Sequence, residues 1–256
     1  GNLTVQGEPA SNDRATLGAA PLRIVESTVS SFFARQIRIR RDANRFEDAL
    51  AGLLSPPQVI PLPDEFQPEV PRLVMTSLHG HSVLEVSQTH VSLKTAYDGD
   101  FATDFRRCQS YISERMERIY PIVEEVSKGD VSFSGIAVKL ECPVSSGVDA
   151  VEVLREKLVR ARIEPSLTDF AAKFTFATDN RYYVNVSVLN YNQFAGAAHE
   201  GRVVPAYLEL VESGIAIVLD RRRLKLVKHL ESLGDRVQDS VFEVYLTATE
   251  LDKLLK

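Results

Sequence analysis

The chain has 256 residues, of which 44% are hydrophobic and 25% are charged, and this composition excludes a wholly disordered protein or a coiled coil. No apolar run approaches the roughly 20 residues that a membrane-spanning helix requires. The net charge of −5 excludes nucleic-acid binding by bulk positive charge, although it leaves a local basic patch open.

The two cysteines, Cys108 and Cys142, are too few for a disulfide framework in so long a chain. We therefore expect reduced thiols and a cytoplasmic location. Residues 1–20 are small and polar and lack the apolar core of a signal peptide. They predict a flexible N-terminal arm.

Residues 21–129 predict a first α+β unit. A strand over 22–33 is followed by an amphipathic helix that begins after Asp42. The segment 55–71 holds six of the twelve prolines, which predicts a long extended connection across the surface. Later elements of this unit are strands at 72–78 and 82–95, the second of them with a turn at 88–89, and a long helix that begins within the acidic segment 98–104.

Residues 130–256 predict a second α+β unit. Its expected elements are a strand at 131–141, a helix at 148–163, a hairpin of 170–178 with 181–191, a loop at 192–202, a strand pair at 207–220 broken near Ser213 and Gly214, and a last long helix from Leu226 to Val244. Both units share one order: strand, helix, a group of strands, then a long helix. We therefore predict an α+β fold of two similar β-α-β-β-β-α units, arising by internal duplication, with mainly antiparallel sheets covered by helices.

Three short stretches carry a resemblance to a known family. They are Pro21-Leu22-Arg23-Ile24-Val25-Glu26 at the first strand, Leu62-Pro63 before a hairpin, and the ending Phe242, Leu246-Thr247, Glu250-Leu251. In these and in its length the chain resembles a sporadically distributed bacterial family of conserved hypothetical proteins. The resemblance implies a bacterial source and carries no activity over to this chain.

The sequence lacks the motifs of nucleophilic and nucleotide-dependent enzymes. It contains no G-x-S-x-G, no phosphate-binding loop and no G-x-G-x-x-G. Cys108 falls on the apolar stripe of a helix, which favours a buried structural thiol over a nucleophile. Cys142 precedes a proline at a strand end and has no histidine nearby in the sequence. We therefore expect no catalytic residue.

Two groups of metal-ligating side chains have simpler explanations. His79 and His81 flank a glycine and predict a polar hairpin turn, since a zinc site needs further ligands. Asp98, Asp100 and Asp104 are able to bind a hard cation, but they also favour a helix N-terminus electrostatically. We therefore expect no metal and no cofactor.

Basic side chains form two local clusters. The first contains Arg35, Arg38, Arg40, Arg41 and Arg45. Arg38 and Arg40 alternate with isoleucines, which predicts that they share one face of a strand. The second contains Arg221, Arg222, Arg223, Lys225 and Lys228, at the start of a predicted helix, where the helix dipole disfavours cations. Each cluster is either a solvated rim with salt bridges or a site for an anionic partner.

Aromatic side chains are concentrated between 170 and 194. Phe170, Phe174 and Phe176 share one parity, which is typical of a core face. Tyr182 has the opposite parity to Tyr183, and we expect it to be exposed, where a nucleobase is able to stack on it.

These observations predict a non-enzymatic interaction or accessory protein that binds a macromolecular partner through sheet edges and arginine patches. The candidate contact residues are Arg38, Arg40, Arg41, Arg221, Arg222, Arg223 and Tyr182. Self-association follows from the same pattern, because open strand edges need covering. Two alternatives stay open: an enzyme or small anionic-ligand binder with a site in the cleft between the two halves, and a protein that binds single-stranded nucleic acid.

Overall fold

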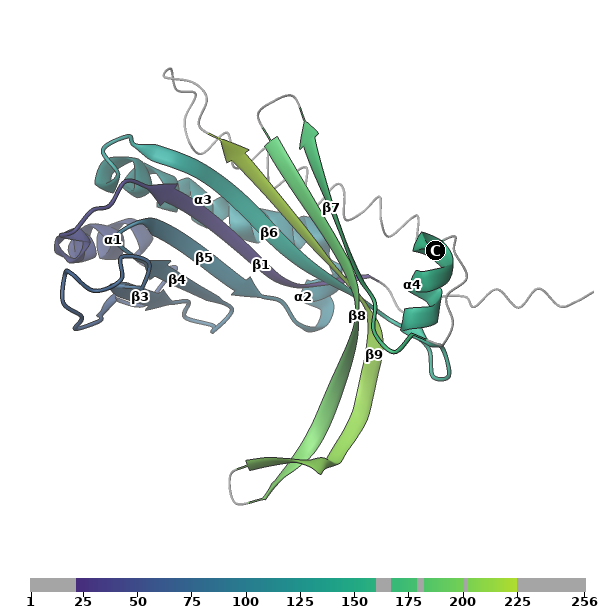
Figure 1. Cartoon of the computed structure of the whole chain (residues 1–256). Helices are drawn as coiled ribbons and strands as arrows, with labels where there is room; N and C mark the ends of the chain where they lie inside the picture. The colour runs from purple at the N-terminus through teal and green to yellow at the C-terminus, as the bar shows by residue number, and fades with distance from the viewer. Residues whose placement is uncertain (1–21, 160–166, 179–181, 200–201, 225–256) are drawn as a thin grey trace, which may run out of the picture.

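The computed structural model describes residues 22–159, 167–178, 182–199 and 202–224. Its strands are β1 (Arg23–Phe33), β2 (Gln58–Val59), β3 (Leu73–Thr76), β4 (Ser82–Val86), β5 (His90–Ala96), β6 (Val131–Pro143), β7 (Ala171–Thr178), β8 (Tyr182–His199) and β9 (Arg202–Leu224). Its helices are the 3₁₀ helix η1 (Ile39–Asp42), α1 (Ala43–Leu50), α2 (Gly99–Thr103), α3 (Phe105–Val126) and α4 (Ala150–Leu158). The α+β class predicted from the sequence is confirmed (Figure 1).

One antiparallel sheet contains all the described strands, in the order β2-β3-β4-β5-β1-β6-β9-β8-β7. The long strand β1 lies in the middle, because its two edges pair with β5 and with β6. Val29, for example, is opposite Leu93 on one side and Ile136 on the other. The β1–β6 pair joins the chain before residue 129 to the chain after it within a single sheet.

The two sides of the β1–β6 pair have the same strand order. β1 is followed outward by β5, β4 and β3, whereas β6 is followed by β9, β8 and β7. On each side, the first strand in the chain (β1 or β6) therefore pairs with the last strand in the chain (β5 or β9). The internal duplication and the boundary near residue 129 stay predictions.

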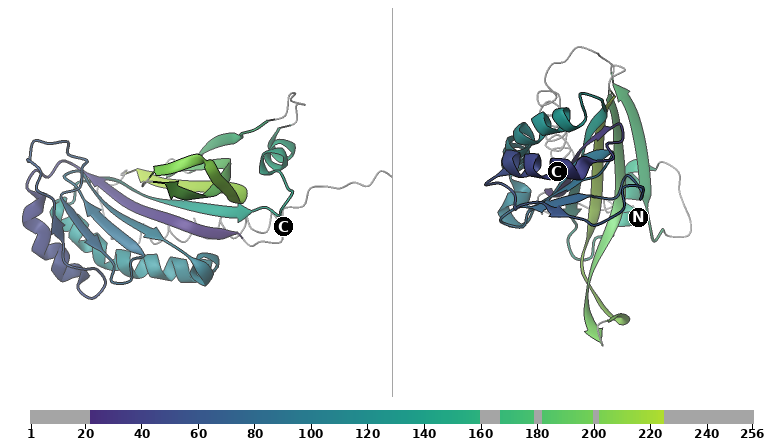
Figure 2. Two further views of the ribbon diagram at one scale, coloured as in Figure 1. Left: turned by 90° about the horizontal axis from the view of Figure 1, so that it is seen from below. Right: turned by 90° about the vertical axis from the view of Figure 1, so that its left-hand side faces the viewer.

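Helices α1 and α3 cover one face of the sheet (Figure 2). Along β1 this covered face carries Ser27, Val29 and Ser31, which are buried, while the alternate residues Thr28 and Ser30 lie on the opposite face. The Tyr111 side chain of α3 reaches Ser82 of β4, with 2.8 Å between the two hydroxyl oxygens. The predicted apolar stripe of α3 is confirmed by the buried residues Cys108, Ile112, Met116 and Ile119.

Several sequence predictions of local structure are wrong. Residues 37–38 form a turn and residues 39–40 begin the 3₁₀ helix η1, so Arg38 and Arg40 do not share a strand face. The chain leaves the strand after β1, where Gln36 N donates to Gln88 O at 2.7 Å. Within the predicted loop 192–202, residues 192–199 and 202 are strand, and β9 runs unbroken through Ser213 and Gly214, where a break was predicted. The predicted helix at 148–163 is shorter, since α4 ends at Leu158.

The second arginine cluster also has a different setting from the predicted one. Arg221, Arg222 and Arg223 lie within β9 and pair with β6, so they are not at the start of a helix. The predicted flexible segment 1–20 and the predicted helix from Leu226 lie outside the described residues. Within the described part of the chain, no helix combines the length and apolarity needed to cross a membrane.

Candidate interaction hairpin and polar cleft

The far parts of β8 and β9 extend beyond the rest of the sheet as a two-stranded ribbon, visible in the lower part of Figure 1. We call residues 191–199 and 202–213 the projecting hairpin. The last residue of β6, Pro143, pairs with Gly214, and β7 pairs with β8 only as far as Leu189. Beyond these points, no described strand lies beside either outer edge of the hairpin.

The surface of the projecting hairpin is partly apolar. The exposed fractions of Phe194, Leu210 and Val211 are 54%, 54% and 63%. Val211 is an extra residue in β9, because Gln193 pairs with Glu212 while Phe194 pairs with Leu210. Such a bulge turns side chains away from the regular alternation. A two-stranded ribbon with exposed apolar side chains is marginally stable in water by itself, and so it is suited to contact a partner.

Gly214 marks the base of the projecting hairpin. A Cβ atom at this position would lie 2.4 Å from the Cys142 carbonyl oxygen and 2.7 Å from Cε1 of Tyr191. The absence of a side chain therefore lets the Tyr191 ring lie directly against the β9 backbone. Ser213 and Gly214 were predicted to form a turn. In the structure they lie within β9, and Gly214 lets the Tyr191 ring approach the β9 backbone closely.

A cluster of charged side chains joins three strands at this base. Arg23 of β1 donates to Glu141 of β6 at 2.7 Å and forms a second ion pair with Glu212 of β9. The Tyr191 hydroxyl donates to Glu212 at 2.8 Å. Burial opposes ionisation of Glu212, but the hydrogen bonds from Arg23 and Tyr191 outweigh it and lower the pKa of this carboxyl. Burial and the bond to Glu212 raise the pKa of Tyr191.

A cleft of about 650 Å³ adjoins this charged cluster, between the start of β1, helix α2 and the base of the projecting hairpin. Its charged lining consists of two basic and four acidic side chains, which are Arg23, Lys139, Glu26, Asp98, Glu141 and Glu212. Residues from both sides of residue 129 line this cleft. The excess of carboxylates opposes the binding of an anion there.

The candidate nucleophile and metal ligands have structural surroundings. Cys108 is buried, and its thiol donates to the Phe101 carbonyl at 3.1 Å. Burial raises the pKa of this thiol to about 12, which leaves it protonated and unreactive. Asp104 caps helix α3 by accepting from Arg107 N at 3.0 Å. Among the described residues, no group of three or more His, Cys, Asp or Glu side chains is arranged to hold a metal ion.

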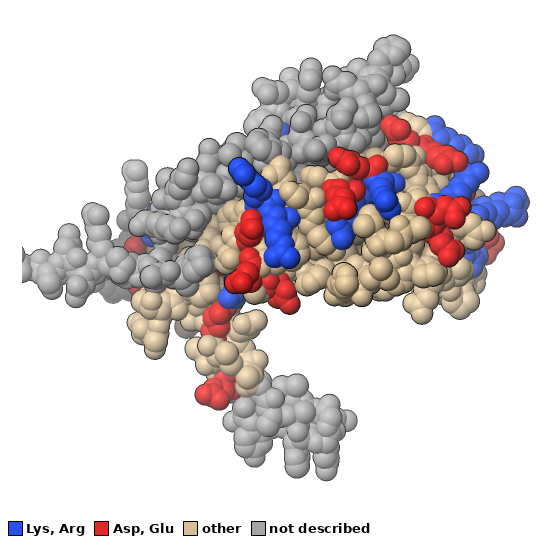
Figure 3. All heavy atoms as spheres, turned by 180° about the vertical axis from the view of Figure 1, so that it is seen from behind, with Lys and Arg blue, Asp and Glu red and all other residues tan. Residues whose placement is uncertain are grey.

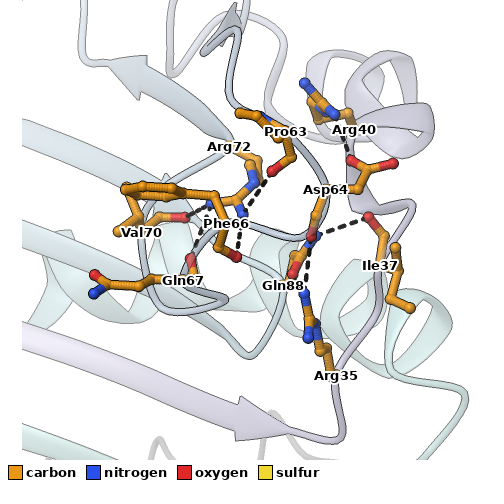
Figure 4. A network of polar contacts seen from close by, with 10 residues as sticks. All are labelled: Arg35, Ile37, Arg40, Pro63, Asp64, Phe66, Gln67, Val70, Arg72 and Gln88. Carbon is orange, nitrogen blue, oxygen red and sulfur yellow. Dashed lines mark hydrogen bonds and ion pairs between the residues drawn. The ribbon is translucent and has the colours of Figure 1, made fainter.

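The first arginine cluster is partly used within the fold (Figure 4). Arg40 forms an ion pair with Asp64 of the proline-rich segment, and Arg35 donates to the Asp64 carbonyl at 2.8 Å. Gln88 donates to the same carbonyl at 2.9 Å. Arg38 and Arg41 are exposed. Arg40 therefore helps to hold the connector, whereas Arg38 and Arg41 remain accessible to a partner.

Arg72 is an important residue that the sequence reasoning missed. Its exposed fraction is 0%, and its guanidinium donates to four backbone carbonyls of the proline-rich segment (Figure 4). The acceptors are Pro63, Phe66, Gln67 and Val70, at distances from 2.6 to 3.4 Å. The Pro63 and Gln67 carbonyls also accept from the backbone N–H groups of Phe66 and Val70, and the buried cation adds a charged donor to all four carbonyls. The only sequence signal was a single arginine beside an apolar strand.

The arginines of the second cluster, Arg221 to Arg223, lie on β9 opposite the start of β8, which contains Tyr182. Arg221 is 7% exposed, so it is not accessible as a partner contact. Tyr182 of β8 pairs with Arg223 of β9, and Tyr183 pairs with Arg222. The side chains of Tyr182, Arg222 and Arg223 lie outside the described residues.

The described surface in Figure 3 carries charges of both signs. Lysine and arginine side chains there are interspersed with aspartates and glutamates, without one continuous basic area. This face does not have the electrostatic character of a phosphate-binding surface.

Comparison with known proteins gives one partial match. Residues 217–256 are similar to the family described as CRISPR associated protein Cas2. No curated protein matches the chain. Only residues 217–224 of the matched segment, the end of β9, belong to the described structure. The match covers less than half of the chain and therefore links its C-terminal segment, not the whole protein, to a CRISPR-associated family.

Proposed function

We propose that the protein is a non-enzymatic interaction or accessory protein that binds a macromolecular partner through the projecting hairpin. Arg38 and Arg41 are proposed as further contacts, because they are exposed beside the turn that follows β1. Arg222, Arg223 and Tyr182 remain candidates from the sequence. The observation that carries the proposal is the hairpin itself, with two outer edges beside which no described strand lies and with its exposed Phe194, Leu210 and Val211.

The chemistry of the hairpin supports a protein partner in particular. An open strand edge offers a row of backbone donors and acceptors, and a partner strand satisfies them by extending the sheet. When a partner covers the exposed apolar side chains of the hairpin, each Å² of apolar surface removed from water stabilises the complex by about 25 cal/mol. The charged cluster of Arg23, Glu141, Glu212 and Tyr191 fixes the base of the hairpin, so that its orientation is set before the partner binds.

The test is affinity purification from the source cell at low salt, with nuclease treatment and mass spectrometry. A double variant, Leu210→Asn with Val211→Asn, removes the apolar surface of the hairpin. The matched control, Phe66→Asn with Leu78→Asn, removes two exposed apolar side chains elsewhere. We expect a stoichiometric partner with the unaltered protein and the control, and its loss with the hairpin variant. Equal recovery of the partner with both variants would contradict the proposal.

A second candidate function is binding of single-stranded nucleic acid. The observation that favours it is the match of residues 217–256 to the Cas2 model, a family named for its association with CRISPR nucleic acid. The candidate predicts binding of an unstructured oligonucleotide that weakens steeply between about 50 and 200 mM salt. Arg38→Ala with Arg41→Ala would weaken that binding. An absence of binding at low salt would exclude the candidate.

A further inference from the structure

We propose that the β8 edge of the projecting hairpin pairs with the same edge of a second copy of the chain. The two hairpins would form a four-stranded antiparallel sheet across a twofold axis. The inference rests on the proposed function and names the partner of the hairpin as this protein itself.

The β8 edge is long enough for stable pairing. Between Tyr191 and His199 no described strand lies on the side of β8 away from β9, because the pairing with β7 ends at Leu189. This stretch has nine residues, which exceeds the typical strand length of about five or six. An equally long ladder with a second copy is therefore available.

The β9 edge of the hairpin is protected against pairing with a strand of another molecule, whereas the β8 edge is not. The β9 edge has Glu209 and Glu212 as well as Pro205, and both register irregularities of the hairpin place their extra residues in β9. Charges, prolines and bulges are the devices by which natural proteins block edge pairing. From Tyr191 to His199, β8 contains no aspartate, glutamate, lysine, arginine or proline. Only the β9 edge is thus blocked.

Twofold symmetry fits this edge. Two identical strands that pair antiparallel are related by a twofold axis. The stretch 191–199 of one copy therefore faces the same stretch of the other copy, running in the opposite direction. Charged residues on such a strand would face like charges, and this stretch of β8 has no acidic or basic side chain other than His199 at its end. The exposed Phe194 lies near the middle of the stretch and would be covered by the second copy.

The first test is sedimentation equilibrium of the purified full chain over a range of concentrations. We expect a dimer whose dissociation constant increases at least about tenfold in Phe194→Lys, because two lysines then lie near the axis. Leu78→Lys is the matched control, with the same charge on an exposed apolar position outside the projecting hairpin, and it should remain dimeric. Circular dichroism and the unfolding midpoint verify that both variants fold.

The second test is cross-linking, which does not depend on a disruptive variant. Ala195→Cys places a thiol near the axis, while the natural Cys108 and Cys142 are buried. Mild oxidation should link two copies of this variant and should not link Glu209→Cys on β9. A monomer at all concentrations, or equal cross-linking of both variants, would overturn the inference. A monomer that still captures a different cellular protein through the hairpin would leave the proposed function intact.

Discussion

Arg72 shows how a single buried cation organises a long irregular segment. Its guanidinium is buried and donates to four carbonyls, so that removing it takes a charged donor from each of them. Arg72→Met should lower the free energy of unfolding by about 3 kcal/mol, as measured by urea denaturation. Arg40→Met breaks the partly exposed ion pair with Asp64 and should cost less than about 1 kcal/mol. Equal losses in the two variants would contradict this role for Arg72.

Cys108 makes stability depend on alkaline pH. Burial, assisted by Asp104, raises the pKa of its thiol from 9.0 to about 12. The unfolded thiol loses its proton near pH 9 while the folded thiol keeps it, so the unfolded state is favoured as the pH rises between those values. Cys108→Ala should therefore reduce the loss of unfolding free energy between pH 8 and about pH 11 in urea titrations.

The slope of stability against pH is the informative quantity for this variant, because the alanine also leaves a cavity that lowers stability at every pH. Tyr120, whose pKa is raised well above its usual value by burial, keeps part of the alkaline loss in place. Identical slopes for the natural chain and the variant would show that the Cys108 thiol already ionises in the folded state.

At the level of elements, the base of the projecting hairpin depends on Gly214. Gly214→Ala would force its new Cβ against the Cys142 carbonyl and the Tyr191 ring, which must then move away from Glu212. We expect a loss of about 2 kcal/mol and faster amide hydrogen exchange in residues 191–195. Tyr191→Phe is the control, because it removes the hydroxyl bond and keeps the ring. If the alanine variant exchanges no faster than the control, the close approach is not what positions the hairpin.

The elements that the sequence predicted well carry their signal locally. The strand at 22–33 and the hairpin around 179–180 have β-branched and aromatic residues between turn signals. The projecting hairpin was missed because residues 192–202 are rich in alanine, glycine and asparagine, which have low strand propensity. Its two strands form through pairing with each other, and this pairing overrides local preference.

The candidate site was predictable only in part, for a related reason. The alternation of arginine with isoleucine over 37–40 imitates a strand, yet Ile39 is buried in a 3₁₀ helix while Ile37 is 51% exposed. The charged cluster of Arg23, Glu141 and Glu212 joins residues that are far apart in the chain. No spacing pattern in a single sequence reveals such contacts.

At the scale of the molecule, the two predicted units share one hydrophobic core. Buried side chains from both sides of residue 129 form a single cluster, and β1 pairs with β6 along most of its length. We expect a single cooperative unfolding transition. The two buried cysteines serve as natural probes, since Cys108 lies in α3 and Cys142 in β6. Pulsed thiol labelling with mass spectrometry should give the same urea midpoint for both, and separate midpoints would indicate two independently folding units.

The central position of β1 also has a consequence for the chain while the ribosome is making it. The partner strand β5 of β1 is translated before helix α3, but β6 emerges only after this helix, and β6 in turn waits for β9. A nascent chain therefore carries an unpaired edge at the centre of its future sheet until residues 202–224 have left the exit tunnel. The unpaired edge of β1, followed by that of β6, is what a nascent-chain chaperone would need to shield.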